Sequence, residues 1–131
     1  MAEVDPWAEY GRLTGKEQAR LTPAERRLMA LGGLRAEVNN GGFHHYFFNS
    51  AGDLVTDALD AAQVADADEL TSLIRRALSL LNVPDPSDRV ARQDAVSKLE
   101  PEQFADVDDS YYAVEASADL DSVMRAVMRK A

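Results

Sequence analysis

Residues 37–53 read EVNNGGFHHYFFNSAGD, and this stretch decides the fold of the chain. It contains both histidines, three of the four phenylalanines and two adjacent glycines. Glycine interrupts helices and permits tight bends. The pair Gly41-Gly42 therefore predicts a bend, at which a helix ending near Asn39 and Asn40 leads directly into a short aromatic helix.

Helical signals fill the rest of the chain. Pro6 and Pro23 each follow a residue that caps helices, which is the arrangement of a helix start. Apolar residues recur at helical spacing over 70–81 and over 120–128, whereas no stretch alternates with the period of two typical of strands. The sequence predicts one compact all-α domain, residues 1–131, of about seven helices, several of them short.

Aspartates mark the predicted starts of three later helices, because aspartate is favoured as an N-cap. Asp53 is expected to begin the helix that follows the aromatic segment. Asp66 or Asp68 is expected to cap the next one. Asp85, which lies between two prolines, is expected to cap a weaker helix that reaches Val96.

The composition is that of an acidic globular protein. The net charge of −9 disfavours direct binding to nucleic acid or to an anionic membrane. No apolar run approaches the length of a transmembrane helix, and the N-terminus lacks the basic and apolar regions of a signal peptide. The chain contains no cysteine. We therefore expect a cytoplasmic protein without disulfides or cysteine-bound metal.

The acidic residues are segregated along the chain. Seven acids and no base lie between Arg35 and Arg75, and eight acids and no base lie between Lys98 and Arg125. In the first block, Asp53, Asp57 and Asp60 lie at positions i, i+4 and i+7 of one predicted helix face. The sequence places no Lys or Arg near them. Such like-charge spacing mildly disfavours a helix.

A row of helix carboxylates can imitate a nucleic-acid strand. Acids one helical turn apart are separated by about 5–6 Å, and phosphates on one DNA strand advance by about 3.4 Å. The alternative is that these acids cap helices or form a solvated face. The predicted partner-binding residues are Asp53, Asp57, Asp60, Asp106, Asp108 and Asp109.

The aromatic bend admits three interpretations. The glycines can let two helix ends meet while the aromatic side chains fill the core. The free amides near Gly41 and Gly42 can hold an anion. Glu37, His44, His45 and Asp53 form the one candidate set of metal ligands. Adjacent histidines point about 100° apart on a helix, so we expect no metal.

The sequence gives no support for catalysis. It contains no nucleophile elbow, no phosphate-binding loop, no dinucleotide fingerprint and no zinc-protease motif. Paired carboxylates are common in so acidic a chain and therefore indicate nothing specific. No cofactor is expected.

Two segments of the chain form a recognisable motif pair. The main motif consists of Glu37, Asn40, Gly41, Gly42, Phe43, Tyr46, Phe47 and Asn49, with Gly52 beyond it. The second segment comprises Asp108, Asp109, Tyr111 and Tyr112, followed by the terminal helix from Leu120. Together these segments resemble a bacterial family of DNA-mimic proteins built on a domain of unknown function. The resemblance covers about residues 20–131 and departs from the family at His45, where the family usually has Gln.

The resemblance implies an all-helical fold in which the shared motif is structural. It also implies an acidic surface that occupies the DNA-binding face of a basic partner such as a transcription factor. Two alternatives stay open: an immunity-type protein that neutralises a basic toxin, and a ligand-binding or enzymatic protein that uses the bend from Glu37 to Tyr46. The sequence also leaves open a homodimer.

Overall fold

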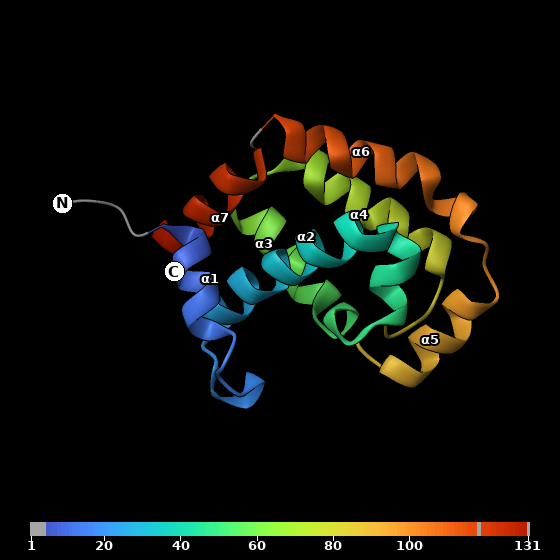
Figure 1. Ribbon diagram of the computed structural model, residues 1–131, viewed down its shortest axis with the longest axis horizontal. Coiled ribbons are helices and arrows are strands. Elements are labelled where there is room, and N and C mark those ends of the chain that lie inside the picture. The colour runs from blue at the N-terminus through green and yellow to red at the C-terminus, as the bar shows by residue number, and fades with distance from the viewer. Residues whose placement is uncertain (1–4, 118, 131) are drawn as a thin grey trace.

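The computed structural model describes residues 5–117 and 119–130 (Figure 1). These residues form seven α-helices and three short 3-10 helices, with no strand among them, so the predicted all-α class is confirmed. The α-helices are α1 (Pro6–Leu13), α2 (Pro23–Phe48), α3 (Val55–Val64), α4 (Asp68–Leu81), α5 (Arg89–Ser97), α6 (Ala105–Ala116) and α7 (Asp119–Arg129). The 3-10 helices are η1 (Gln18–Arg20), η2 (Ser50–Leu54) and η3 (Pro101–Phe104).

Helix α2 is the centre of the fold. It runs through the middle of the molecule in Figure 1 and packs against α1, α3, α5, α6 and α7. Helix α4 packs against α3, α5 and α6. The side chains of α2 that are at most 2 % exposed include Leu28, Leu31, Leu34, Val38, Phe43, Tyr46 and Phe47. The remaining helices thus bury one long helix along most of its length.

The two helix starts that contain proline are confirmed. Asp5 accepts a hydrogen bond from the amide of Trp7 at 3.2 Å. Thr22 and Glu25 form the reciprocal capping box, with backbone-to-side-chain distances of 3.1 and 2.9 Å. Each cap satisfies amides that have no partner within the helix, which explains why these local signals suffice to locate α1 and α2.

The predicted cap at Asp53 is wrong. Residues 50–54 form η2, and α3 begins at Val55 without a side-chain cap. The carboxylate of Asp53 is directed instead to Arg89 and Arg92 of α5. A distant pair of arginines therefore competes successfully with the local capping role.

The caps predicted for α4 and α5 are also wrong. Helix α4 begins at Asp68 without a side-chain cap, and Asp66 occupies the left-handed region in the preceding turn, with φ of 56°. Helix α5 is capped by Asp88, which accepts from the amide of Ala91 at 3.2 Å. Asp85 instead accepts from the amide of Ser87 and closes a turn ahead of the helix.

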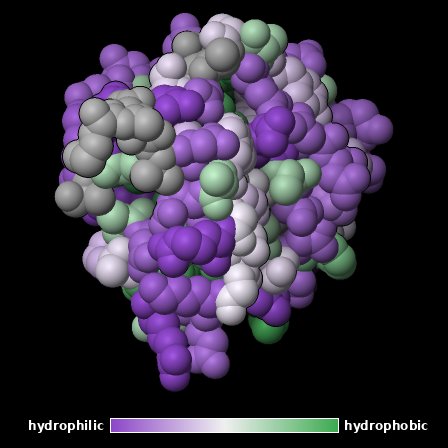
Figure 2. Space-filling view, turned by 60° about the vertical axis from the view of Figure 1, so that its left-hand side comes forward, coloured by the Kyte–Doolittle hydropathy of each residue, from purple (hydrophilic) through white to green (hydrophobic). Residues whose placement is uncertain are grey.

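The surface is mainly polar on the face that Figure 2 displays, where hydrophobic residues are scattered rather than gathered into a large patch. Within the described residues, no helix combines the length and the apolar composition needed to cross a membrane.

Candidate functional site

The predicted bend divides α2 into two helical segments. Gly41 and Gly42 have non-helical backbone angles, and Gly42 has a φ of 74°, in the left-handed region that favours glycine. A Cβ atom at position 42 would also collide with the carboxylate of Asp108. Conformation and space both require glycine here, and the aromatic segment 43–48 begins as a separate helical stretch.

The first amide of the aromatic segment binds a carboxylate of the protein itself. Asp108 of α6 accepts a hydrogen bond from the backbone amide of Phe43 at 2.8 Å. Burial raises the pKa of Asp108, and the hydrogen bond from Phe43 opposes that shift. The interpretation that free amides at the bend bind an anion therefore has a specific form in this structure: the anion is a half-buried side chain, supplied from α6.

The other end of the aromatic segment is closed by a buried arginine that sequence reasoning missed. The side chain of Arg92 is fully buried. It donates to the carbonyl oxygens of Phe47 at 2.7 Å, Asn49 at 2.9 Å and Pro86 at 2.8 Å. The Nη2 atom of Arg92 that binds Asn49 also donates to Asp53 Oδ1, at 2.8 Å. Cationic donors at a helix C-terminus satisfy its unpaired carbonyls and its dipole.

A signal for Arg92 was present in the sequence. Arg92 precedes Val96 by four residues and lies on the same face of α5, and both are the buried residues of that helix. A charged residue on an apolar face indicates a buried ion pair or a set of backbone acceptors. What the sequence does not show is which carbonyls it binds, because Phe47 and Asn49 are more than 40 residues away.

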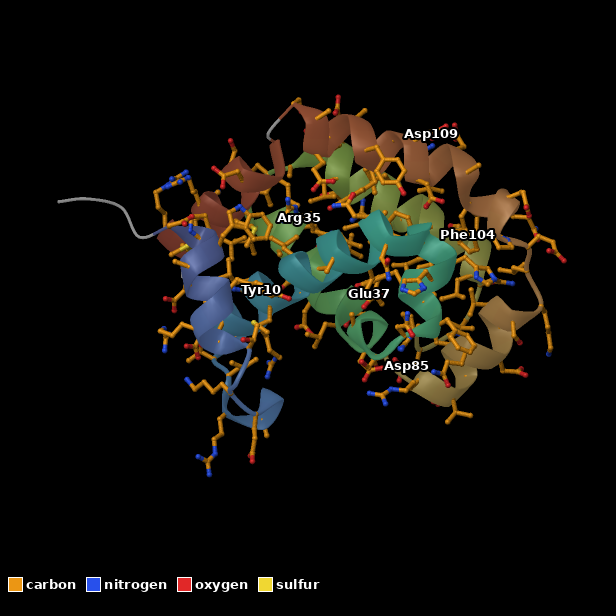
Figure 3. The ribbon with its side chains drawn as sticks, in the orientation of Figure 1. Tyr10, Arg35, Glu37, Asp85, Phe104 and Asp109 are labelled. Carbon is orange, nitrogen blue, oxygen red and sulfur yellow. The ribbon has the colours of Figure 1, made fainter. Side chains whose placement is uncertain are left out.

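Three of the four aromatic side chains in segment 43–48 are packed in the core, whereas Phe48 is half exposed. Phe43, Tyr46 and Phe47 have no exposed surface. The rings of Phe43 and Tyr46 are 5.9 Å apart and nearly perpendicular, and the rings of Phe47 and Phe104 are 5.8 Å apart. Figure 3 shows Phe104 beside the end of α2, from which it reaches this cluster. The aromatic side of the bend is filled by protein atoms.

The polar side of the bend is a compact cluster. His45 Nε2 lies 2.7 Å from Glu37 Oε2, and Asn49 Nδ2 lies 3.1 Å from the same oxygen. The side-chain nitrogen of Asn40 lies 3.1 Å from His45 Nε2. Glu37, labelled in Figure 3, thus holds the two segments of α2 together across the glycines.

The four candidate metal ligands do not converge. His44 Nε2 lies 2.9 Å from the carbonyl oxygen of Leu99, whereas His45 Nε2 lies 2.7 Å from Glu37. Glu37 contacts His45, while Asp53 contacts arginines. In the described part of the chain, no group of three or more His, Asp or Glu residues is arranged to hold a metal ion.

Three acids of the first block are offset by arginines from distant segments. Asp57 lies 3.6 Å from Arg26, and Asp60 lies 2.6 Å from Arg27, both on α2. Asp53 pairs with Arg89 at 2.5 Å and with Arg92. The hydrogen bond from Arg89, followed by that from Arg92, lowers the pKa of Asp53. The expectation that no base offsets these three acids is therefore wrong, because folding interleaves the charge blocks.

The second block presents acids to solvent. Glu102, Asp106 and Asp109 are exposed and follow one another at helical spacing along η3 and α6. Asp106 lies 3.0 Å from Arg76 but stays 89 % exposed. Asp109 makes no ion pair with a described residue, and in Figure 3 it lies at the outer edge of the molecule. We call Glu102, Asp106 and Asp109 the α6 acidic ridge.

Comparison with known proteins places the chain in a family. The sequence model of the DMP19-like protein family matches residues 19–130, nearly the whole chain. No curated protein and no solved structure shows a significant match. The matched range includes the glycine bend, the residues that close both ends of its aromatic segment, and the α6 acidic ridge. The chain therefore belongs to the DMP19-like protein family, a family of DNA mimics built on a domain of unknown function.

Proposed function

We propose that this protein is a DNA mimic whose α6 acidic ridge occupies the DNA-binding surface of a basic protein, such as a transcription factor. Membership of the DMP19-like protein family supports the proposal, and so does the net charge of −9. The observation that carries it is the ridge itself. All three of its carboxylates are exposed, and Glu102 and Asp109 make no ion pair with a described residue, whereas Asp53, Asp57, Asp60 and Glu115 are paired with arginines.

The geometry of the ridge suits this role. Glu102, Asp106 and Asp109 are spaced by four and three residues, so their Cβ atoms lie roughly 5–6 Å apart where the chain is α-helical. The Arg and Lys side chains of a DNA-binding protein would meet these carboxylates in place of phosphates. Because the contacts are between exposed charges, the affinity should fall steeply as salt rises.

The six aspartates predicted from the sequence contribute unequally to this proposal. Asp106 and Asp109 belong to the ridge. Asp108 is half-buried and binds the amide of Phe43. The three acids near α3 would have to leave their arginines before they could meet a partner, as the contacts of Asp57 and Asp60 with α2 show. We therefore place the first partner contacts on α6.

The test begins with the full chain as bait in a native cell extract, washed at low and at raised salt, with bound proteins identified by mass spectrometry. We expect a basic DNA-binding protein that salt releases and that its own DNA displaces. A secreted basic nuclease among the captured proteins would instead favour the neutralisation of a toxin. No basic protein released by salt would contradict both functions.

A pair of matched variants then locates the surface. Asp106→Asn with Asp109→Asn should weaken binding of the captured protein by about tenfold at low salt and flatten its salt dependence. The control is Glu17→Gln with Asp94→Asn, which removes the same charge from exposed positions on the N-terminal segment and on α5. Equal effects of the two variants would indicate a response to net charge alone and would contradict a ridge-specific contact.

A further inference from the structure

Three hollows that share lining residues lie along α4 and α6, two helices that are side by side in Figure 1, and together we call them the α4–α6 groove. Its largest part has a volume of about 770 Å³, and two smaller hollows adjoin it. All three share Asp68, and two share Ser72, Arg76 or Val114. None of the three hollows is lined by a residue of the aromatic bend.

The helices on either side of the groove are antiparallel. Arg76, in the second half of α4, reaches Asp106 and Ser110 in the first half of α6. The opposite end of the groove is lined by Asp68 and Val114. Helix α4 has 14 residues, so the groove alongside it is about 21 Å long at a rise of about 1.5 Å per residue.

The lining of the groove suits the close approach of another helix. Its floor includes the buried apolar residues Leu73, Val107 and Val114. Small side chains line its walls. These are Thr71, Ser72, Ser79, Ser110 and Ala113. An apolar floor between small residues is the shape into which the ridge of an amphipathic helix packs.

Positive and negative side chains lie at different positions along the groove. Arg75 is exposed and makes no hydrogen bond or ion pair with a described residue, whereas its neighbour Arg76 is held by Asp106 at 3.0 Å. Asp68 and Glu69 at the other end are exposed and likewise have no ion pair within the described chain. Arg75 follows Asp68 by seven residues, which is two helical turns or about 10.5 Å.

We propose that the α4–α6 groove binds one amphipathic helix of the basic partner. That helix carries a carboxylate opposite Arg75 and, two turns away, a lysine or arginine opposite Asp68 and Glu69. The inference rests on the proposed function, since it names the part of the partner that docks beside the α6 acidic ridge. The ridge supplies long-range attraction, and the groove selects a helix with a defined charge order.

The test uses synthetic helices and the full chain labelled with ¹⁵N. Each peptide has the length of α4, one apolar stripe, and a Glu and a Lys two turns apart. Two peptides carry this pair in opposite orders, and two others carry Glu or Lys at both positions. One of the Glu–Lys peptides should shift the amide resonances of Ser72, Ser79 and Ser110. The all-Glu and all-Lys peptides should bind about tenfold more weakly.

A charge exchange makes the assignment specific. Arg75→Glu should weaken binding of the Glu–Lys peptide about tenfold. The same variant should restore affinity for the peptide with Lys at both positions. Arg20→Glu on η1, an exposed residue far along the chain, makes the same change of charge and should leave the peptide affinities unchanged. Ser72→Trp, which fills the groove without altering charge, should abolish the shifts.

Each other outcome has a definite meaning. Binding of the all-Glu or all-Lys peptide in preference to both mixed ones would overturn the inference, as would the absence of shifts along the groove for every peptide. Self-association of the free chain through Ser72 and Ser110 would assign the groove to a second copy and would also overturn it. The proposed function survives these failures if substitution of the α6 acidic ridge still weakens binding of the captured partner.

Discussion

Asp108 Oδ1 accepts a hydrogen bond from the backbone amide of Phe43 at 2.8 Å, across 65 residues of sequence. This contact joins α6 to the first turn after the glycine bend, where an amide would otherwise lack a partner. Replacing Asp108 by Ala should lower the free energy of unfolding by about 1 kcal/mol, the usual loss for an N-cap. Urea denaturation measures this change.

A second variant separates the hydrogen bond from the charge. Burial raises the pKa of Asp108, which means that the environment disfavours its ionised form. Asp108→Asn keeps an oxygen acceptor without the charge, so it should retain most of the stability that Asp108→Ala loses. Asp109→Asn, at the exposed neighbouring position, is the control and should leave stability unchanged. Equal losses for the Ala and Asn variants at position 108 would show that the charge itself is needed.

Removal of the buried guanidinium should be far more damaging. Arg92→Leu leaves three carbonyl oxygens and the carboxylate of Asp53 without this donor. Breaking such a buried arrangement typically costs about 3–5 kcal/mol. Arg89→Leu is the matched control, because Arg89 binds Asp53 from the solvent side and should matter much less. Thermal and urea denaturation measure the stability of both variants. Similar losses of stability for the two would contradict this prediction.

Two tyrosines should tolerate loss of their hydroxyl groups. Tyr46 and Tyr111 are fully buried, and neither hydroxyl has a hydrogen-bond partner among the described residues. Burial raises the pKa of both, since it disfavours the phenolate. Because a buried hydroxyl without a partner is unfavourable, Tyr46→Phe and Tyr111→Phe should be neutral or stabilise the fold by up to about 1 kcal/mol. A clear loss in urea denaturation would instead reveal a hydrogen bond to those hydroxyls.

The pH dependence of stability should report the Asp53 pairs. The pKa of Asp53 is lowered in the folded state, first by Arg89 and then by Arg92. The unfolded state therefore binds the proton more tightly, and the stabilisation is complete above the unfolded pKa of about 3.9. It is lost as the pH falls through the folded pKa. At neutral pH the Asp53→Asn variant should be less stable than the unsubstituted protein. Its free energy of unfolding should also fall less between about pH 5 and pH 2. Parallel curves for the two proteins would contradict the role of this residue.

The acids of α3 provide a graded test of the partner surface. Asp57→Asn with Asp60→Asn removes two charges that already contact Arg26 and Arg27. The double variant should weaken binding of the captured partner less than Asp106→Asn with Asp109→Asn does, because those arginines compete for the α3 carboxylates. Isothermal titration at two salt concentrations compares the variants. A larger effect at α3 would move the partner surface to that helix.

Local chemistry explains how much of the fold the sequence predicts. The proline and threonine that begin α2, and the glycines that bend it, act on adjacent residues, so a linear pattern reveals them. The charge pairing is not local. Asp60 meets Arg27, which lies 33 residues earlier, and Asp53 meets Arg92, which lies 39 residues later. Which acids stay free for a partner is therefore a property of the tertiary structure.

The position of Arg92 also has a consequence for the dynamics of the protein. Its guanidinium belongs to α5, yet it binds the last carbonyls of α2, so α5 cannot detach without exposing them. Gln93 adds a bond to the carbonyl of Phe48 at 2.7 Å. Amide hydrogens of α5 and of the last turn of α2 should therefore exchange with deuterium at similar rates, as one cooperative unit, although α5 has only nine residues.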